Sequence, residues 1–398
     1  MTTLETPARI EPCQLNHYPE RLADVTSAIT ATAAALGSKL HPITARSLAG
    51  LVRVMNCYYS NLIEGHDTRP RDIERALSGE LLTDERRSLQ LEARAHIQVQ
   101  RSIEDRFAAG TLGEPAQPGF VRWLHEEFYA HVPAELATIH DHRGSYQMQP
   151  GEFRHEPRHD NVVGRHVPPS SAAVASFMDY FSERFRLEPL GPAARLVAIA
   201  VAHHRLNYIH PFPDGNGRVS RLMSHAMALK SGIGAHGLWS ISRGLARGLS
   251  ERGEYKAMMD HADSPRESDL DGRGNLSLRA LQEYATWFCE VMLDQLTFME
   301  QLLELNALES RLADYVARNL RLPLAAAMLV RALLQRGDMP RGDASLVTRL
   351  PERTARELLS RLIDAGLVGS ETPKGPVSLR FDSQSAEALF PRLFPAQA

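Results

Sequence analysis

A helical period in the apolar residues dominates this chain of 398 residues. Apolar side chains recur every three or four positions, which places them along one face of an α-helix. The pattern predicts helices over residues 20–37, 45–63, 80–106, 120–131, 171–186, 192–208, 217–230 and 276–304. A further helix is expected to begin at Pro70, because proline suits the first turn of a helix. The sequence therefore predicts a mainly α-helical protein.

Segment 143–169 interrupts the helical pattern. Glycines, prolines and the pair Asp160-Asn161 separate short extended stretches there, which predicts a small β-hairpin or flap. The alternative is an ordinary surface hairpin, because the segment is rich in His and Arg rather than in residues that favour strands. His155, His159 and His166 show no recurring ligand spacing, so no metal site is predicted from them.

The last part of the chain has a different order of elements. Helical stretches at 307–319, 324–335, 345–350 and 352–365 precede two short strands around the turn Pro-Lys-Gly-Pro at 373–376. Helices followed by a hairpin are the order of a winged helix. Residues 307–398 carry twelve Arg and one Lys against ten acidic residues, a net charge of +3. DNA binding and docking of a protein partner are both open for this segment, since affinity for DNA rests largely on phosphate neutralisation.

Composition limits the function classes and the compartment. The net charge of −3 excludes a globally basic nucleic-acid binder but not a local basic patch. Cys13, Cys57 and Cys289 are few, odd in number and far apart, which argues against a disulfide framework and a structural zinc site. No signal peptide is evident at the N-terminus, and the apolar stretch 193–202 is too short to span a bilayer. We expect a cytoplasmic protein that does not bind membranes.

The residues 210–221, HPFPDGNGRVSR, combine features of a phosphate site. Gly215 and Gly217 flank Asn216 where a helix should begin, and glycines let successive N–H groups converge on an anion. A helix N-terminus attracts phosphate for the same reason. Arg218 and Arg221 are three residues apart, hence on one helix face, where both can bind phosphate oxygens.

Two further side chains of this segment suit group transfer. His210 has an ordinary pKa near neutrality, which suits a general base. Asp214 is a hard oxygen ligand, and Mg²⁺ commonly binds one carboxylate together with nucleotide phosphates. The alternative is a structural turn in which His210 and Asp214 only cap helices.

The string HPFPDGNGR resembles the signature of the Fic family, HPFx(D/E)GN(G/K)R, at every defined position, and Arg221 extends the match to the family's second arginine. Segments 150–154 and 242–263 also resemble the family. The resemblance implies a Fic-type helical bundle with a small β-hairpin flap. It implies transfer of AMP from ATP to a Ser, Thr or Tyr hydroxyl of a target protein, with automodification and a homodimer as further possibilities.

The resemblance also implies roles for individual residues. His210 would deprotonate the hydroxyl, Asp214 would hold Mg²⁺, and Phe212 would anchor the loop. The flap, roughly 152–168, would pair by its backbone with the target segment. The implied ATP- and phosphate-binding residues are Gly215, Asn216, Gly217, Arg218 and Arg221.

An upstream motif is similar to the inhibitory helix of Fic proteins. Ser60 to Gly65, SNLIEG, matches the pattern (S/T)xxxE(G/N). The alternative is an ordinary helix end with Gly65 as its cap. Glutamate in a last helical turn is slightly unfavourable, which favours a pairing role. The resemblance implies that Glu64 pairs with Arg221 and inhibits transfer.

The predicted domains are an N-terminal helical region with the inhibitory helix (1–114), a Fic core with the following helix (115–304) and a winged-helix-like domain (305–398). Two other functions stay open. The motif is compatible with transfer of UMP or phosphocholine and with removal of AMP. The chain could also be a DNA-binding regulator whose Fic core only senses nucleotide.

Overall fold

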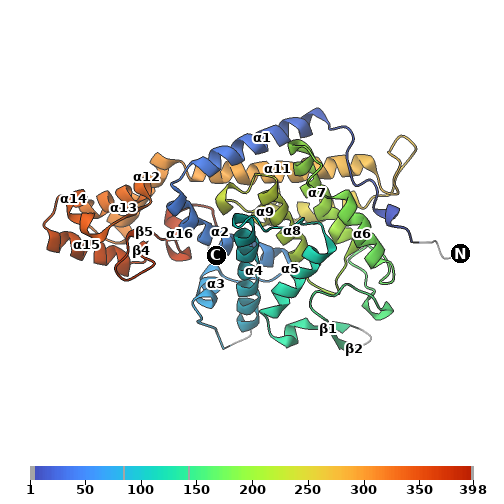
Figure 1. Cartoon of the computed structure of the whole chain (residues 1–398), viewed down its shortest axis with the longest axis horizontal. Helices are drawn as coiled ribbons and strands as arrows, with labels where there is room; N and C mark the ends of the chain where they lie inside the picture. Colours follow the sequence, from blue (N-terminus) through green and yellow to red (C-terminus); the bar gives the residue numbers. More distant parts are fainter. Residues whose placement is uncertain (1–4, 84–85, 142–143, 396–398) are drawn as a thin grey trace. The chain divides into compact units, whose positions relative to one another are not determined.

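The computed structural model describes residues 5–83, 86–141 and 144–395. The chain forms two compact units. As far as they are described, the first unit comprises Met1–Ala31, Asn56–Gly234 and Ile241–Gln295, and the second comprises Thr32–Met55, Ala235–Ser240 and Leu296–Ala398. Both units are mainly α-helical, as the sequence predicts (Figure 1). The domain limits at 114 and 304 stay a prediction.

The helices of the first half of the chain follow the predicted pattern. They are α1 (Glu20–Ser38), α2 (Pro42–Ile63), α3 (Pro70–Leu77), α4 (Arg86–Ala108), α5 (Pro118–Ala130), α6 (Val174–Arg184), α7 (Pro192–Ile209) and α8 (Asn216–Lys230). A short 3-10 helix, Pro7–Ile10, precedes them. Prolines occupy the first turn of α3, α5 and α7, where a missing N–H removes no helical hydrogen bond.

The predicted start of the fourth helix at residue 80 is wrong. Residues 80–83 form no helix, and 84–85 lie outside the described residues. The Gln90 side chain explains the difference, because its Oε1 accepts the Leu82 N–H at 2.7 Å and its Nε2 donates to the Asp72 carbonyl at 2.8 Å. The first bond satisfies the Leu82 N–H in the loop before α4 without a helical turn, and the second ties α4 to α3.

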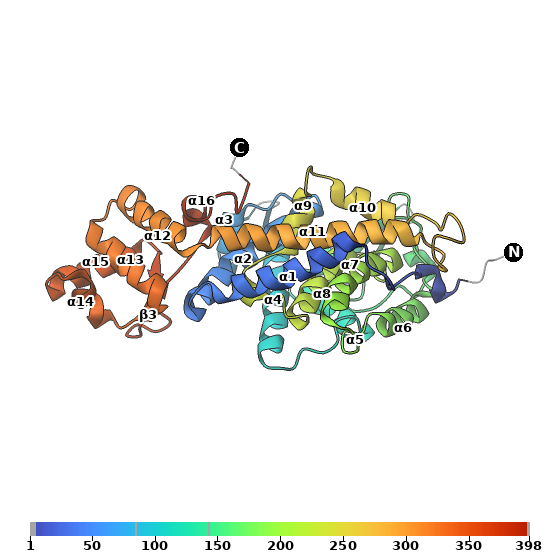
Figure 2. The same ribbon diagram turned by 90° about the horizontal axis from the view of Figure 1, so that it is seen from above.

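In the first unit, α8 packs against α4, α5 and α7 and lies in the interior. The facing helix α7 is buried from Leu196 to Ile209 except at the half-buried Asn207, which is why its apolar residues at 196–202 form a continuous run rather than a stripe. Phe177, Phe181 and Phe288 are fully buried in this core. The long helix α11 (Leu278–Leu302) lies beside the first turns of α1, where Glu290 pairs with Arg21 (Figures 1 and 2).

The β-hairpin of the first unit begins earlier than predicted. Strands β1 (Thr138–Asp141) and β2 (Gly144–Gln147) are antiparallel, with Ile139 opposite Tyr146. The flap segment 152–168 itself contains only a 3-10 turn, Pro157–His159, and one bridge between Val163 and His166. Proline at 157 and 168 lacks the N–H that a strand ladder needs, which explains the irregular backbone.

The second unit contains helices and a small sheet. Its main elements are α12 (Leu305–Asp314), a π-helical turn (Tyr315–Asn319), α13 (Leu324–Arg336), β3 (Asp338–Met339), α14 (Ala344–Thr348), α15 (Glu352–Asp364), β4 (Val368–Gly369), β5 (Val377–Leu379) and α16 (Ser383–Leu389). The strands are antiparallel in the order β3-β5-β4. Strands β4 and β5 lie where the sequence predicts them, whereas β3 is too short to give a periodic signal.

Two short helices, α9 (Ile241–Arg247) and α10 (Glu254–Ala262), follow α8 in the chain.

Cys13, Cys57 and Cys289 are buried and free. Within the ranges that the structure describes, no helix is both long and apolar enough to cross a bilayer.

Candidate active site

His210 directly follows α7, in a left-handed conformation with φ 50° and ψ 59°. Its N–H donates to the Leu206 carbonyl at 2.9 Å, so it caps the helix. The next residue is Pro211, which has no N–H to continue the helix. A residue with a side chain seldom adopts this conformation, and here it turns the chain sharply from α7 into the loop before α8.

The imidazole of His210 is neutral near pH 7. Burial lowers its pKa to about 4, and the charges of Arg154 and His166 act in the same direction. The ring forms a hydrogen bond with the backbone carbonyl of Asn207. A neutral imidazole that donates one N–H keeps a lone pair on its other nitrogen. His210 can therefore accept a proton.

The loop between α7 and α8 is fixed by Phe212 and Asn216. The Phe212 ring is fully buried and stacks on His125, with 3.9 Å between ring centroids. The Asn216 side chain accepts the Phe212 N–H at 2.9 Å and donates to its carbonyl at 2.8 Å. Because both ends of its amide are engaged in this way, Asn216 offers its backbone N–H to a ligand rather than its side chain.

Helix α8 opens with a set of backbone donors. Gly215 precedes it at φ 79°, a conformation that favours glycine, and the Val219 N–H closes the first turn on the Gly215 carbonyl at 3.0 Å. The N–H groups of Asn216, Gly217 and Arg218 belong to the first turn, which has no intrahelical acceptors for them. This N-terminus suits an anion.

Asp214 lies on the same loop and is exposed. Its Oδ2 accepts the Tyr129 hydroxyl at 2.9 Å, and its backbone carbonyl lies 3.3 Å from His125 Nε2. Partial desolvation raises the pKa of Asp214, but Arg218, the Gly215 N–H and the Tyr129 hydroxyl outweigh it and lower the pKa. Asp214 is therefore a carboxylate, and an exposed carboxylate fits a cation that also binds phosphate. Among the described residues, no three His, Cys, Asp or Glu side chains gather as a metal site.

Arg218 is paired with a carboxylate that the sequence did not reveal. Its Nη2 lies 3.3 Å from Glu92 Oε2, and its guanidinium lies over the Phe128 ring at 5.1 Å. His66 Nδ1 lies 3.3 Å from the same Glu92 oxygen. Burial opposes the charge of Arg218, but Glu92, Tyr129 and Asp214 raise its pKa. Glu92 is on α4, and its distance along the chain from Arg218 left no sequence signal for the pair.

Arg221 contacts the segment that contains the upstream motif. Its Nε donates to Ser60 Oγ at 2.9 Å, and its Nη2 donates to Glu64 Oε1 at 2.5 Å. Gly65, at φ 87°, follows the end of α2. Burial raises the pKa of Glu64, but Arg221 and Arg218 outweigh it, so the pKa is lowered and the group is charged.

The Glu64 carboxylate covers the first turn of α8. A Cβ placed on Gly217 would lie 2.5 Å from Glu64 Oε1 and 3.1 Å from an Arg221 nitrogen. Glu64 therefore occupies space beside the backbone donors of α8. All ten predicted site residues lie in this region of the first unit, namely Ser60, Glu64, Gly65, His210, Asp214, Gly215, Asn216, Gly217, Arg218 and Arg221.

Comparisons with known proteins agree with this fold and motif. Residues 121–228 match the Fic/DOC family. The protein adenylyltransferases Fic of Drosophila erecta and Drosophila virilis are 36% and 38% identical to this chain over 85 residues, 21% of this chain. The match spans 17% of the length of each relative.

Two solved structures share the fold. A Fic family protein from Desulfovibrio desulfuricans G20 has 16% identity and a TM-score of 0.53, covering 92% of this chain and 98% of its own. A Fic domain containing signaling protein from Bacteroides thetaiotaomicron VPI-5482 has 19% identity and a TM-score of 0.51, covering 71% and 96%. The fold is thus mainly α-helical with a small β-hairpin, and α8 begins with N–H groups that have no acceptor within the helix. Residues 121–228 of this chain form a Fic/DOC domain.

Proposed function

We propose that this protein is a protein adenylyltransferase that transfers AMP from ATP to a Ser, Thr or Tyr hydroxyl of a target protein. The main support is the position of the neutral His210, which is joined by one short loop to the N-terminus of α8 and its first-turn N–H groups. A base beside an anion site is the arrangement that this transfer needs. Relatives named protein adenylyltransferase Fic carry the matching segment.

In the proposed reaction His210 accepts the proton of the target hydroxyl. The hydroxyl oxygen forms a bond to the α-phosphorus, the bond between the α-phosphorus and its bridging oxygen breaks, and pyrophosphate leaves. The N–H groups of Asn216 and Gly217 and the guanidiniums of Arg218 and Arg221 hold the phosphates. Catalysis then rests on positioning and charge stabilisation, as in other phosphoryl transfers.

Asp214 is the residue that would hold Mg²⁺. The ion supplies charge neutralisation for the phosphates when bound. Tyr129 orients the carboxylate by its hydroxyl, and His125 supports the backbone of the same residue. The His125 tautomer follows from its partners, because Nδ1 accepts the Gly151 N–H at 2.9 Å and Nε2 is left to donate to Asp214.

Replacing Asp214 by Ala should lower the transfer rate by at least about 100-fold, since metal stabilisation of a transferring phosphate is worth several kcal/mol. Tyr129→Phe keeps the carboxylate but removes its hydrogen bond, and it should weaken Mg²⁺ binding by about tenfold. Titration of the transfer rate with Mg²⁺ measures both effects. Full activity of Asp214→Ala in EDTA would contradict the assignment.

The low pKa of His210 predicts a pH profile. The base is neutral above its pKa of about 4, so transfer should stay near its full rate as the pH falls from neutrality and should decline only as the pH approaches 4. The measurement is the initial transfer rate of Glu64→Gly across this range, with circular dichroism as a control for folding. A decline centred at the ordinary histidine value of 6.5 would contradict the assignment.

We further propose that Glu64 inhibits the transfer. Its carboxylate occupies one guanidinium nitrogen of Arg221 and places a negative charge beside the first turn of α8. Both effects would displace a bound triphosphate. The proposed ligands of the site are therefore ATP and Mg²⁺, with Glu64 as a competitor for the phosphate end.

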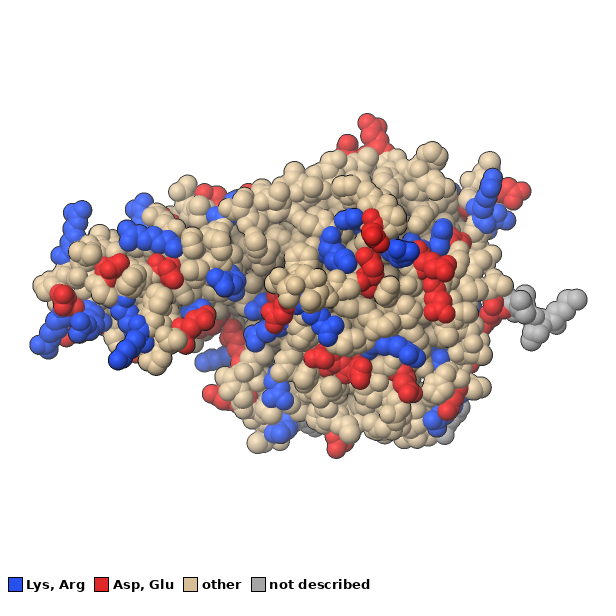
Figure 3. All heavy atoms as spheres, in the orientation of Figure 1, with Lys and Arg blue, Asp and Glu red and all other residues tan. Residues whose placement is uncertain are grey.

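The winged-helix assignment of the second unit is also a proposal, supported by the order of α13, α14, α15 and the β4–β5 hairpin. The mixed charges of its candidate recognition helix, α15, favour a protein partner over DNA. Arg353 pairs with Glu357 at 3.0 Å, and Arg356 lies 4.0 Å from Glu352. Basic and acidic side chains are interspersed over the face in view in Figure 3.

One experiment separates adenylyl transfer from uridylyl transfer and from a DNA-binding regulator. The protein and Glu64→Gly are incubated with Mg²⁺ and each of four α-labelled nucleoside triphosphates, alone and with a cell lysate. Label from ATP on a protein supports adenylyl transfer. Label from UTP alone would show that the protein transfers UMP instead. No label from any nucleotide, together with a gel shift on DNA, would favour the regulator.

A further inference from the structure

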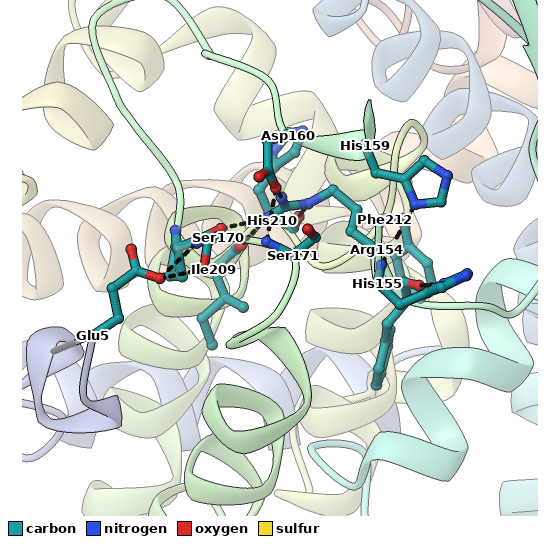
Figure 4. Close-up of polar contacts among 12 residues, drawn as sticks. Glu5, Arg154, His155, His159, Asp160, Ser170, Ser171, Ile209, His210 and Phe212 are labelled. Carbon is teal, nitrogen blue, oxygen red and sulfur yellow. Dashed lines mark hydrogen bonds and ion pairs between the residues drawn. The ribbon is translucent and has the colours of Figure 1, made fainter. Parts of the chain in front are cut away.

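Arg154 is a buried arginine to which the proposed chemistry assigns no role. Its side chain is 1% exposed. It belongs to the segment that follows the β1–β2 hairpin, and Figure 4 shows it among the loop at 155–160, the residues after Pro169 and the end of α7. A buried guanidinium is costly unless its donors are satisfied, so its partners indicate what it does.

Arg154 holds the backbone on both sides of the catalytic turn. Its Nε donates to the His210 carbonyl at 2.7 Å, and its Nη2 donates to the Ile209 carbonyl at 3.2 Å. Its own N–H donates to the Pro211 carbonyl at 2.8 Å. Three consecutive carbonyls at the end of α7 therefore bond to one residue. These bonds restrain the left-handed conformation of His210.

The same guanidinium closes the base of the loop 155–168. Nη2 donates to the Pro169 carbonyl at 2.9 Å, and Nη1 pairs with Asp160 Oδ1 at 3.0 Å. Asp160 Oδ1 also accepts the Ser171 N–H at 2.7 Å, as Figure 4 shows. Both ends of the loop are thus tied to the residue that holds His210.

We propose that Arg154 is a positioning residue. Its guanidinium holds the His210 turn and both ends of the loop 155–168, so that His210 keeps a fixed position relative to this loop. The proposal rests on the proposed role of His210 as the base. A planar fork with five N–H donors is needed for partners in these directions, and lysine cannot replace it.

The positive charge of Arg154 adds a second effect. Burial is the largest cause of the low pKa of His210, and Arg154 is next. His166 also lowers this pKa, whereas Asp214 and the Asn207 carbonyl raise it. Removing the Arg154 charge should therefore move the titration of His210 upward.

The test uses the full chain with Arg154→Met and Arg154→Lys, and Arg195→Met as the matched control. Arg195 also binds backbone carbonyls, those of Leu187 and Leu190 at 3.0 and 2.8 Å, but at the other end of α7. The first readout is the titration of the His210 imidazole by NMR, with the signal assigned through His210→Gln. This readout requires no transfer activity, so it remains decisive if the proposed function fails.

We expect His210 to titrate near pH 4 in the wild type and in Arg195→Met, and at a higher pH in Arg154→Met. In the Glu64→Gly background, both Arg154 variants should lose about 100-fold in kcat, because small misplacement of a catalytic group has that effect. The KM for ATP should change little, because Arg154 is outside the proposed phosphate-binding set. Arg154→Lys keeps the charge, so its His210 should titrate as in the wild type while kcat falls.

An unchanged His210 titration in folded Arg154→Met overturns the electrostatic part of the proposal, and an unchanged kcat in folded Arg154→Lys overturns the positioning part. If Arg154→Met does not fold, Arg154→Lys decides alone. Loss of kcat with a wild-type melting temperature and KM then supports the proposal, and retention of kcat refutes it.

Discussion

Glu64→Gly is expected to transfer AMP about 100-fold faster than the wild type. A misplaced reacting atom can cost about that factor in rate, and the substitution would let the α-phosphorus return to its position. In the wild type the carboxylate binds Arg221 Nη2 at 2.5 Å and covers Gly217. Its removal frees a guanidinium nitrogen and takes a negative charge away from the first turn of α8. Arg221 should stay in place, since Ser60 Oγ still accepts its Nε at 2.9 Å.

Stability should move in the opposite direction. The Arg221 side chain is 1% exposed, and loss of its carboxylate partner leaves a buried charge less well compensated. Glu64→Gly should therefore melt at a lower temperature than the wild type while it works faster. Glu64→Gln is the matched control, because it keeps the shape and removes the charge, and it should fall between the two in activity. A Glu64→Gly protein that melts lower without any gain in rate would make Glu64 a structural residue.

His210→Ala in the Glu64→Gly background is expected to lower the transfer rate by about 100- to 10,000-fold, the usual effect of losing a general base. The side chain is neutral and hydrogen-bonds to the Asn207 carbonyl, so it contributes little to holding a triphosphate. ATP binding, measured by calorimetry, should therefore stay close to that of the parent. Transfer at the parent rate would exclude His210 as the base.

The local part of this site could be predicted from the sequence. His210 to Arg221 are close along the chain, and their arrangement follows from a helix end, a proline, two glycines and a helix start. The upstream motif implied a contact of Glu64 with Arg221, and the structure contains this ion pair. The helices were predicted well where one face is buried, since such faces impose a clear period.

Long-range contacts could not be predicted in this way. Glu92 pairs with Arg218 and Gln90 caps the loop before α4, and neither contact leaves a pattern in the sequence. Arg154 belongs to segment 150–154, which resembles the family, but its bonds to the carbonyls of Ile209 and His210 depend on how the chain folds back. The hairpin β1–β2 was misplaced because four-residue strands carry too few residues to show an alternation.

The most direct test of the account is the intact mass of two proteins after incubation with ATP and Mg²⁺, Glu64→Gly and Glu64→Gly/His210→Ala, each alone and with a cell lysate. The account predicts a mass increase of one AMP group on Glu64→Gly or on a lysate protein treated with it, and none with the double variant. An equal increase with both variants, or no AMP on any protein, would contradict it.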